Sequence, residues 1–226
     1  MCFSATASFS AGIILSTIGV ISIKKAESRS QLAFASIPII FAIQQIIEGI
    51  LWLALTNPDF AFLKEPCTYI FLFFAQVVWP FWVPYSILKL EKYYRKITGK
   101  RILKSIGAIV SLYLGYCLIV YPVNASISGM HITYDQAYPA SLSLIVGLLY
   151  IIATIVPPFY SSFKRMWLLG ASILISYIIT SVFYTDYVVS VWCFFASIIS
   201  ITVYVILLEM KKSKAKAALN KIEFQT

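Results

Sequence analysis

The stretch Phe41-Ala42-Ile43-Gln44-Gln45-Ile46-Ile47-Glu48-Gly49-Ile50-Leu51-Trp52 places a carboxylate inside an apolar segment that runs from residue 31 to residue 55. A helix of this length can cross a hydrocarbon core about 30 Å thick. An ionisable group in a bilayer costs about 2.5–3.5 kcal/mol on insertion scales, so such groups are rare and usually functional. The stretch therefore predicts a membrane helix with a polar site at Glu48.

Six further apolar segments accompany this one in the chain of 226 residues. The chain is 60% hydrophobic with a mean hydropathy of +0.86, whereas a soluble domain is about 45–50% apolar. We therefore expect an all-α integral membrane bundle in contact with membrane lipids. Its seven transmembrane helices are predicted at approximately 6–23, 31–55, 67–90, 105–122, 139–158, 166–184 and 187–209.

The basic residues alternate between successive connections of this bundle. If the N-terminus lies outside, 17 of the 18 lysines and arginines fall on the inner side, and Lys64 is the exception. This positive-inside pattern predicts a transmembrane domain over residues 1–210, with its C-terminus inside, and a basic cytoplasmic tail over residues 211–226. Because this pattern already accounts for the net charge of +9, we do not expect the protein to bind nucleic acid. The basic stretch 89–104 is interpreted as a solvated connection facing lipid headgroups.

Two residue patterns predict the shapes and contacts of the helices. Prolines within a membrane helix free carbonyls that need other partners, so irregular helices are expected at Pro38, Pro80, Pro84, Pro157 and Pro158. The first span carries a small-residue stripe, typical of close helix contact, at Ser8, Gly12, Ser16 and Gly19.

A polar stripe surrounds Glu48. Phe41, Gln45, Glu48 and Trp52 recur at helical spacing and Gln44 borders them, so this face is expected to contact protein or water rather than lipid. The third span is expected to place Gln76 at a similar depth in the membrane, as a candidate partner of Glu48. Trp79 follows three residues later on the same span. Such an acid can carry a proton, act in catalysis or bind a cation. The alternative is a protonated acid that only joins helices through hydrogen bonds.

Cys2 is a second candidate group. Removal of Met1 would expose an N-terminal cysteine, which combines a thiol and an amine and can act as a nucleophile. His131 and Asp135 lie in the fourth connection and are interpreted as a loop hydrogen bond rather than as part of a triad. A disulfide between Cys2 and Cys67 is an open alternative. Four cysteines and one histidine form no CxxC or HExxH motif, so the sequence predicts neither a metal site nor a cofactor.

Two sequence motifs resemble those of a family of uncharacterised bacterial multi-pass membrane proteins, a domain of unknown function. The chain opens Met1-Cys2-Phe3-Ser4-Ala5-Thr6-Ala7-Ser8-Phe9, as in the family pattern MCFSA-x-ASF. Its second span carries Gln44-Gln45-Ile46-Ile47-Glu48-Gly49-Ile50-Leu51-Trp52, as in the pattern QQ-x-x-EG-x-x-W. The resemblance implies a bacterial inner-membrane protein and supplies no substrate or mechanism.

Three functions remain open from the sequence. The favoured one is a carrier or binder of a small cationic or lipophilic molecule, because one acid among amides and indoles suits cation recognition. Its outward-facing pocket is predicted to be lined by Gln44, Gln45, Glu48, Trp52, Gln76 and Trp79. The second is a membrane-embedded enzyme acting on a lipid or thioester, with Cys2 as nucleophile and Glu48 as acid or base. The third is a structural protein without a ligand.

Overall fold

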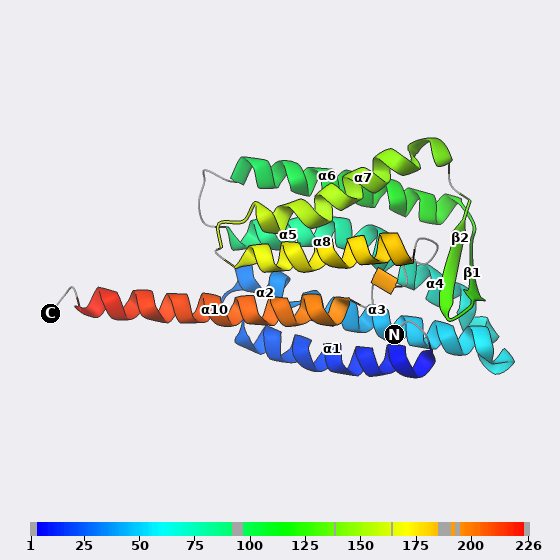
Figure 1. The fold of residues 1–226 in the computed structure, drawn as a ribbon, viewed down its shortest axis with the longest axis horizontal. Helices are drawn as coiled ribbons and strands as arrows, with labels where there is room; N and C mark the ends of the chain where they lie inside the picture. Colours follow the sequence, from blue (N-terminus) through cyan, green and yellow to red (C-terminus); the bar gives the residue numbers. More distant parts are fainter. Residues whose placement is uncertain are drawn as a thin grey trace.

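A computed structural model describes the chain over residues 4–91, 97–137, 139–163, 165–184, 191–192 and 195–223, without the side chains of residues 97, 140, 141 and 214–223. The described part is mostly helical, and its long helices lie alongside one another in a single bundle (Figure 1). Six helical segments in it are long and apolar enough to cross a membrane: Ala5–Lys25, Arg29–Thr56, Pro58–Leu90, Thr98–Val120, Leu142–Phe159 and Met166–Phe183. They correspond to the first six predicted spans.

The described elements follow one another along the chain in this order: α1 (Ala5–Lys25), α2 (Arg29–Ala35), α3 (Ile37–Thr56), the 3-10 helix η1 (Pro58–Leu63), α4 (Lys64–Leu72), the π-helix η2 (Phe73–Val78), α5 (Trp79–Leu90), α6 (Ile97–Val120), β1 (Val123–Ser128), β2 (His131–Gln136), α7 (Ala140–Phe159), α8 (Met166–Phe183) and α10 (Ala196–Glu223). The strands lie at one end of the bundle, called the hairpin end below, and α10 runs out beyond the other, called the basic end (Figure 1).

The seventh expected span, 187–209, lies partly outside the described residues. Helix α10 begins at Ala196 and continues without a break past residue 210 to Glu223. Its first 18 residues include Glu209, Lys211 and Lys212. It is therefore not among the six described helices that are apolar enough to span a membrane.

The first span packs closely on the second, as the small-residue stripe predicts. A Cβ atom added to Gly12 would lie 2.8 Å from Ile46 Cγ1, and one added to Gly19 would lie 2.5 Å from Ile39 Cγ1. The second span is broken at Ser36, because Pro38 has no N–H to continue the helix from α2 into α3.

The third span is irregular at its predicted proline. Pro80 lies in the first turn of α5 and cannot donate a backbone hydrogen bond. The turns directly before α5 form the π-helix η2. Two carbonyls of η2 accept from side chains of neighbouring helices instead. Tyr150 Oη donates to the Ala75 carbonyl at 2.6 Å, and Ser111 Oγ donates to the Val77 carbonyl at 2.7 Å. The expected exchange of backbone for side-chain partners is thus confirmed.

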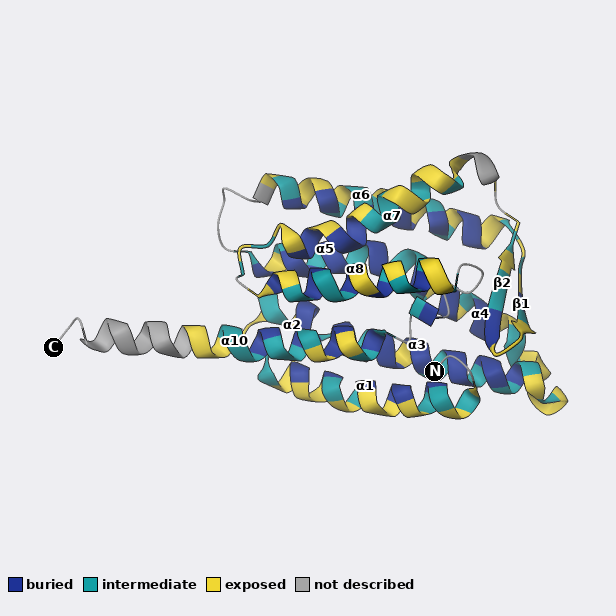
Figure 2. Cartoon of the chain, in the orientation of Figure 1, coloured by how far each residue is buried: buried dark blue, intermediate teal, exposed yellow. Residues whose placement is uncertain are grey.

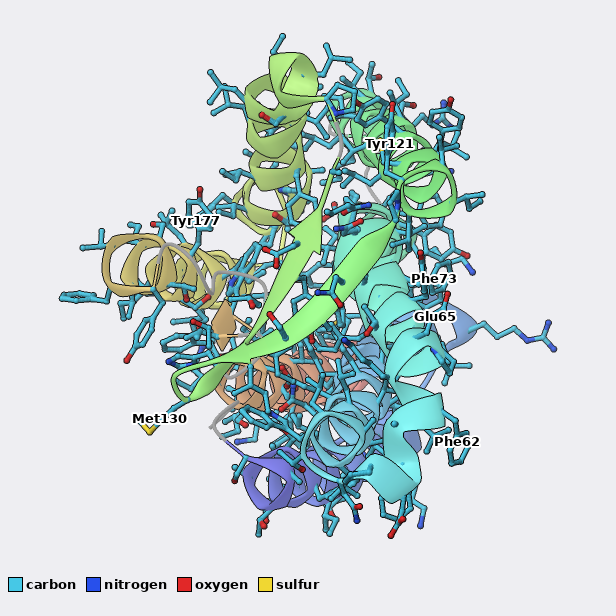
Figure 3. The ribbon with its side chains drawn as sticks, turned by 90° about the vertical axis from the view of Figure 1, so that its right-hand side faces the viewer. Phe62, Glu65, Phe73, Tyr121, Met130 and Tyr177 are labelled. Atoms are coloured by element: carbon cyan, nitrogen blue, oxygen red, sulfur yellow. The ribbon has the colours of Figure 1, made fainter. Side chains whose placement is uncertain are left out.

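The fourth connection differs from the all-α expectation because it contains two strands. β1 and β2 pair antiparallel, with Ser128 opposite His131, and Gly129 between them adopts a φ of 60° that favours glycine. The hairpin lies across the end of the bundle in front of the helices (Figure 3). Two six-residue strands with weak alternation of polarity give little sequence signal, so hydropathy alone missed them.

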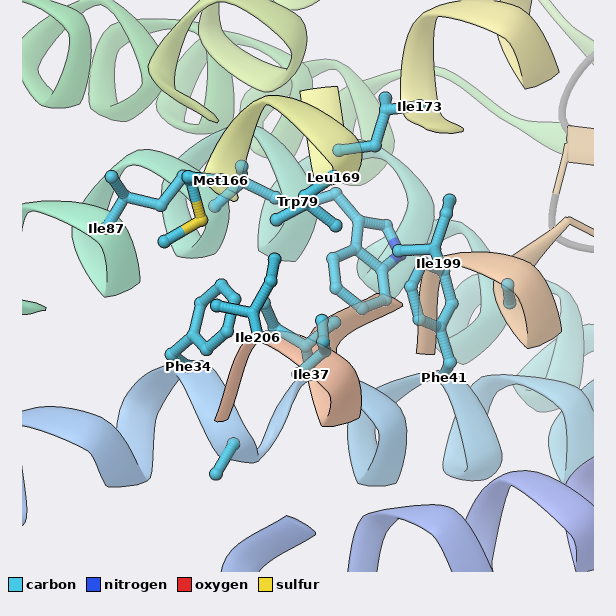
Figure 4. Close-up of a cluster of buried hydrophobic side chains, with 14 of the residues drawn as sticks. Phe34, Ile37, Phe41, Trp79, Ile87, Met166, Leu169, Ile173, Ile199 and Ile206 are labelled. Atoms are coloured by element: carbon cyan, nitrogen blue, oxygen red, sulfur yellow. The ribbon is translucent and has the colours of Figure 1, made fainter. Parts of the chain in front are cut away.

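The interior and the outer surface of the bundle are both apolar. The largest core cluster joins α1, α2, α3, α5, α7, α8 and α10, and includes Phe34, Ile37 and Met166 (Figure 4). Large apolar side chains are also exposed, among them Leu112 at 75% and Ile119 at 87%. Exposed residues recur along the helices on the outside of the bundle (Figure 2). A surface of this kind needs lipid rather than water around it, which agrees with a multi-pass membrane protein.

Candidate functional site

The polar stripe on α3 faces the interior of the bundle, as predicted. All five of its members, Phe41, Gln44, Gln45, Glu48 and Trp52, are buried. Glu48 is fully buried, and Gln45 Nε2 donates to Glu48 Oε2 at 3.0 Å. The carboxyl group therefore has an amide as one partner within its own helix.

Gln44 connects the stripe to the third span. Trp79 Nε1 donates to Gln44 Oε1 at 2.7 Å, and the Trp79 ring stacks on Phe41 with ring centroids 3.9 Å apart. The indole of Trp79 is thus fixed on two sides by α3. Because the ring is already held in place, it would lose little conformational entropy when a ligand binds against it.

A cavity of about 330 Å³ lies beside Trp79, between α3, η2, α5, α6, α7, α8 and α10. This volume is at the lower end of the range for small-molecule sites. Five aromatic residues contribute to its lining: Phe41, Trp79, Tyr150, Tyr177 and Trp192. Its polar lining residues in the described part of the chain are Gln76, Ser143, Thr154 and the hydroxyl and indole groups of the aromatic residues.

The structure does not gather the six expected pocket residues around one space. Gln76 and Trp79 line the cavity, whereas Gln44, Gln45 and Glu48 do not, and Gln44 accepts from the Trp79 indole. Trp52 belongs to another cluster near the hairpin end, with Cys67, Ala125 and Ile132. The helical spacing correctly predicted a shared face for the α3 residues, but of the five only Phe41 lines the cavity, where it stacks on Trp79.

The candidate contact between Gln76 and Glu48 is replaced by a different one. Gln76 Nε2 donates to Gln136 Oε1 of strand β2 at 2.9 Å. This hydrogen bond joins the cavity lining to the hairpin. A second contact holds the hairpin to α4, since Lys64 Nζ donates to Asn124 Oδ1 at 2.9 Å.

Three cavity residues were missed from the sequence: Tyr150, Tyr177 and Trp192. They come from segments more than 70 residues beyond Trp79, and an aromatic residue in an apolar helix is most often ordinary core. A usable signal was the tyrosine content of the fifth and sixth spans, because a hydroxyl in an apolar span needs a partner. The partner of the Tyr150 hydroxyl is the Ala75 carbonyl of η2, in the irregular part of the third span that Pro80 predicts.

A second buried carboxylate lies at the basic end. Glu91 Oε2 is 2.9 Å from Lys100 Nζ, and the two side chains are 0% and 1% exposed. Glu91 Oε1 also accepts from Ser161 Oγ at 2.9 Å and from the Ser162 backbone at 2.8 Å. The interpretation of 89–104 as a solvated connection was therefore wrong at Lys100. Its long side chain is buried because its ammonium group pairs with the buried Glu91 carboxylate.

The pKa of the Glu91 carboxyl is lowered. Burial alone would raise it, but hydrogen bonds from Lys100, from the Ser162 backbone and from Ser161 favour the ionised form and outweigh burial. Glu91 therefore behaves as a fixed negative charge that ties α5 to α6 and to the connection between α7 and α8.

The residues of the nucleophile hypothesis are only partly described. Cys2 lies outside the described residues, and Cys67 is a buried free thiol. His131 is buried, which lowers its pKa, whereas Asp135 is exposed. Asp135 lies four positions beyond His131 on the same strand, which places their Cα atoms about 13 Å apart. The expected hydrogen bond between them is therefore not formed. In the described ranges, no three histidine, cysteine, aspartate or glutamate side chains lie close enough to hold a metal ion.

Comparison with known proteins gives one match. The model of a family of unknown function, DUF6629, matches residues 1–220, which is nearly the whole chain. No curated protein and no solved structure matches.

Proposed function

The chain belongs to the DUF6629 family of unknown function, and we propose that it is a membrane carrier or binder of a small lipophilic or cationic molecule. The observation that carries this proposal is the aromatic cavity of about 330 Å³ between the membrane-spanning helices. Ligand sites are typically concave and mostly apolar, with few polar groups that fix orientation. This cavity has that character, since aromatic and aliphatic side chains dominate its lining.

The ligand would enter from the hairpin end. Ser143 and Gly147 line the cavity from the first half of α7, which follows the hairpin directly. A Cβ atom added to Gly147 would meet no other atom within 4 Å, so the cavity wall is open at this point. Both features favour the outward-facing access that the sequence predicts.

The other two functions have less support. The enzyme hypothesis depends on Cys2, which lies outside the described residues. A purely structural role gives no reason for an aromatic cavity of this volume, because protein interiors normally close-pack. The carrier or binder is therefore the function that the described part of the chain supports best.

The proposal is tested by filling the cavity. Gly147→Phe adds a large side chain to the cavity wall, whereas Leu144→Phe adds bulk at a side chain that is 73% exposed on the same helix. We expect small lipophilic or cationic molecules to raise the unfolding midpoint of the wild type and of Leu144→Phe, but not of Gly147→Phe. The proposal fails if no molecule separates Gly147→Phe from its control.

We further propose seven spans in a bacterial inner membrane, with the N-terminus outside and residues 187–209 as the last span. The described basic end carries Lys25, Lys89, Arg101, Arg165 and Lys211, as an inner face should. A fluorescent protein fused to the C-terminus should then fluoresce inside the cell. A periplasmic alkaline phosphatase inserted at Gly129 should be active. The opposite pair of results would reverse the orientation.

A further inference from the structure

Three aromatic side chains of the cavity, Trp79, Tyr150 and Trp192, direct their polar atoms into the protein. Trp79 Nε1 donates to Gln44 at 2.7 Å. Trp192 Nε1 donates to Ser176 Oγ at 2.9 Å. Tyr150 Oη donates to a backbone carbonyl of η2 at 2.6 Å. These residues therefore offer a ligand the carbon surfaces of their rings rather than hydrogen-bond donors.

The rings around Trp192 meet at an angle rather than in a stack. Its centroid lies 5.9 Å from that of Tyr150 and 5.5 Å from that of Tyr177, with interplanar angles of 57° and 59°. The three rings therefore form one aromatic cluster in the cavity lining. The face of an aromatic ring carries the negative part of its quadrupole, so a cation that contacts the ring faces of this cluster is attracted to them.

The remaining polar groups of the cavity agree with this electrostatic character. The described lining residues include no lysine, arginine or histidine. The Thr154 hydroxyl donates to the Tyr150 carbonyl of its own helix at 2.9 Å. The Gln76 Oε1 atom is buried and has no hydrogen-bond partner among the described residues, so it is available as an acceptor.

Glu48 adds the one carboxyl group in this layer of the bundle. It lies four residues beyond Gln44 on α3, which is about 6 Å along the helix axis. Gln44 in turn holds the Trp79 indole at the cavity wall. An ionised Glu48 would therefore make the potential near Trp79 more negative.

We propose that the cavity selects a lipophilic organic cation, namely an ammonium group that carries an apolar substituent. The ammonium would lie against the rings of Tyr150, Tyr177 and Trp192, and the apolar substituent would fill the aliphatic part of the cavity. This inference rests on the proposed function, because it names the ligand class of the same site.

The test compares three probes of similar shape that differ in charge. Benzyltrimethylammonium is the cation, neopentylbenzene is its neutral carbon analogue, and phenylmethanesulfonate is an anion. Binding to the full chain in detergent micelles is followed by tryptophan fluorescence. The signal of Gly147→Phe is subtracted, so that partition into the micelle does not count as binding.

We expect the cation to bind at least tenfold more tightly than the neutral analogue, and the anion not to bind. Tyr177→Leu should weaken cation binding about tenfold, whereas Tyr177→Phe, which keeps the ring, should leave it unchanged. Equal binding of the cation and the neutral analogue in the wild type would overturn cation selectivity and leave the proposed function intact. Identical signals from the wild type and Gly147→Phe for every probe would count against both.

Discussion

The two buried glutamates of this bundle differ in what surrounds them. Glu91, at the basic end, contacts the Lys100 ammonium and accepts two further hydrogen bonds from the connection between α7 and α8. Glu48, in the middle of α3, accepts from the neutral amide of Gln45. A buried carboxylate with a cation and several donors is held in one charge state. The comparison assigns a structural role to Glu91, while the role of Glu48 remains part of the proposed function.

Loss of the cation should have the largest effect. Lys100→Met leaves the Glu91 charge buried without its ion-pair partner, and we expect it to lower the free energy of unfolding by about 3–5 kcal/mol. The measurement is unfolding in detergent micelles. The double variant Glu91→Gln/Lys100→Met should recover most of the loss, because it removes both charges. A Lys100→Met protein as stable as the wild type would show that the ion pair is not structural.

Truncation of Glu48 should have a smaller effect. Glu48→Ala leaves the buried Gln45 amide without its acceptor, and we expect a loss of about 1–3 kcal/mol in the same unfolding measurement. Glu48→Gln keeps an acceptor oxygen at the same place and should cost less than about 1 kcal/mol. If Glu48→Gln were as damaging as Lys100→Met, the two carboxylates would not differ in the way described.

The pH dependence of stability should come from Glu91. Because its pKa is lower in the folded protein than in the unfolded chain, the folded state favours the ionised form. Its contribution to stability is then fully present above about pH 4.3, the usual glutamate value, and is lost as the pH falls through the lower folded pKa. The stability difference between the wild type and Glu91→Gln should therefore shrink below that pH. A difference that grew with acid would give the opposite sign.

The smallest expected effect is that of Glu48 on the ligand. If Glu48 acts through the potential near Trp79, Glu48→Gln should weaken benzyltrimethylammonium binding about threefold and leave neopentylbenzene unchanged. Abolition of binding would instead require direct contact between Glu48 and the ligand. The fluorescence titration that compares the three probes distinguishes these results.

The sequence predicts the parts of this molecule that depend on local patterns. Hydropathy located six described spans, helical spacing predicted that Glu48 and its neighbours face inward, and Pro80 marked the irregular third span. Each of these properties is fixed by residues within one segment. The glycine stripe of α1 likewise needs only its own spacing to predict close contact.

The cavity and the ion pair could not be predicted in the same way. Trp79, Tyr150 and Trp192 meet only because α5, α7 and the residues before α10 pack together, and nothing local distinguishes them from core aromatics. In the sequence, Lys100 cannot be distinguished from the other basic residues of its connection, and only the structure shows its ion pair with Glu91. Both features depend on the order in which the helices pack, which hydropathy does not encode.

The central claim is that the aromatic cavity holds a small molecule. Intact-mass spectrometry of the chain, released gently from its native membrane, tests it most directly. We predict a small-molecule adduct on the wild type and on Leu144→Phe that disappears on denaturation and is absent from Gly147→Phe. An adduct of the same mass retained by Gly147→Phe would place the ligand elsewhere, and no adduct on any of the three proteins would contradict the account.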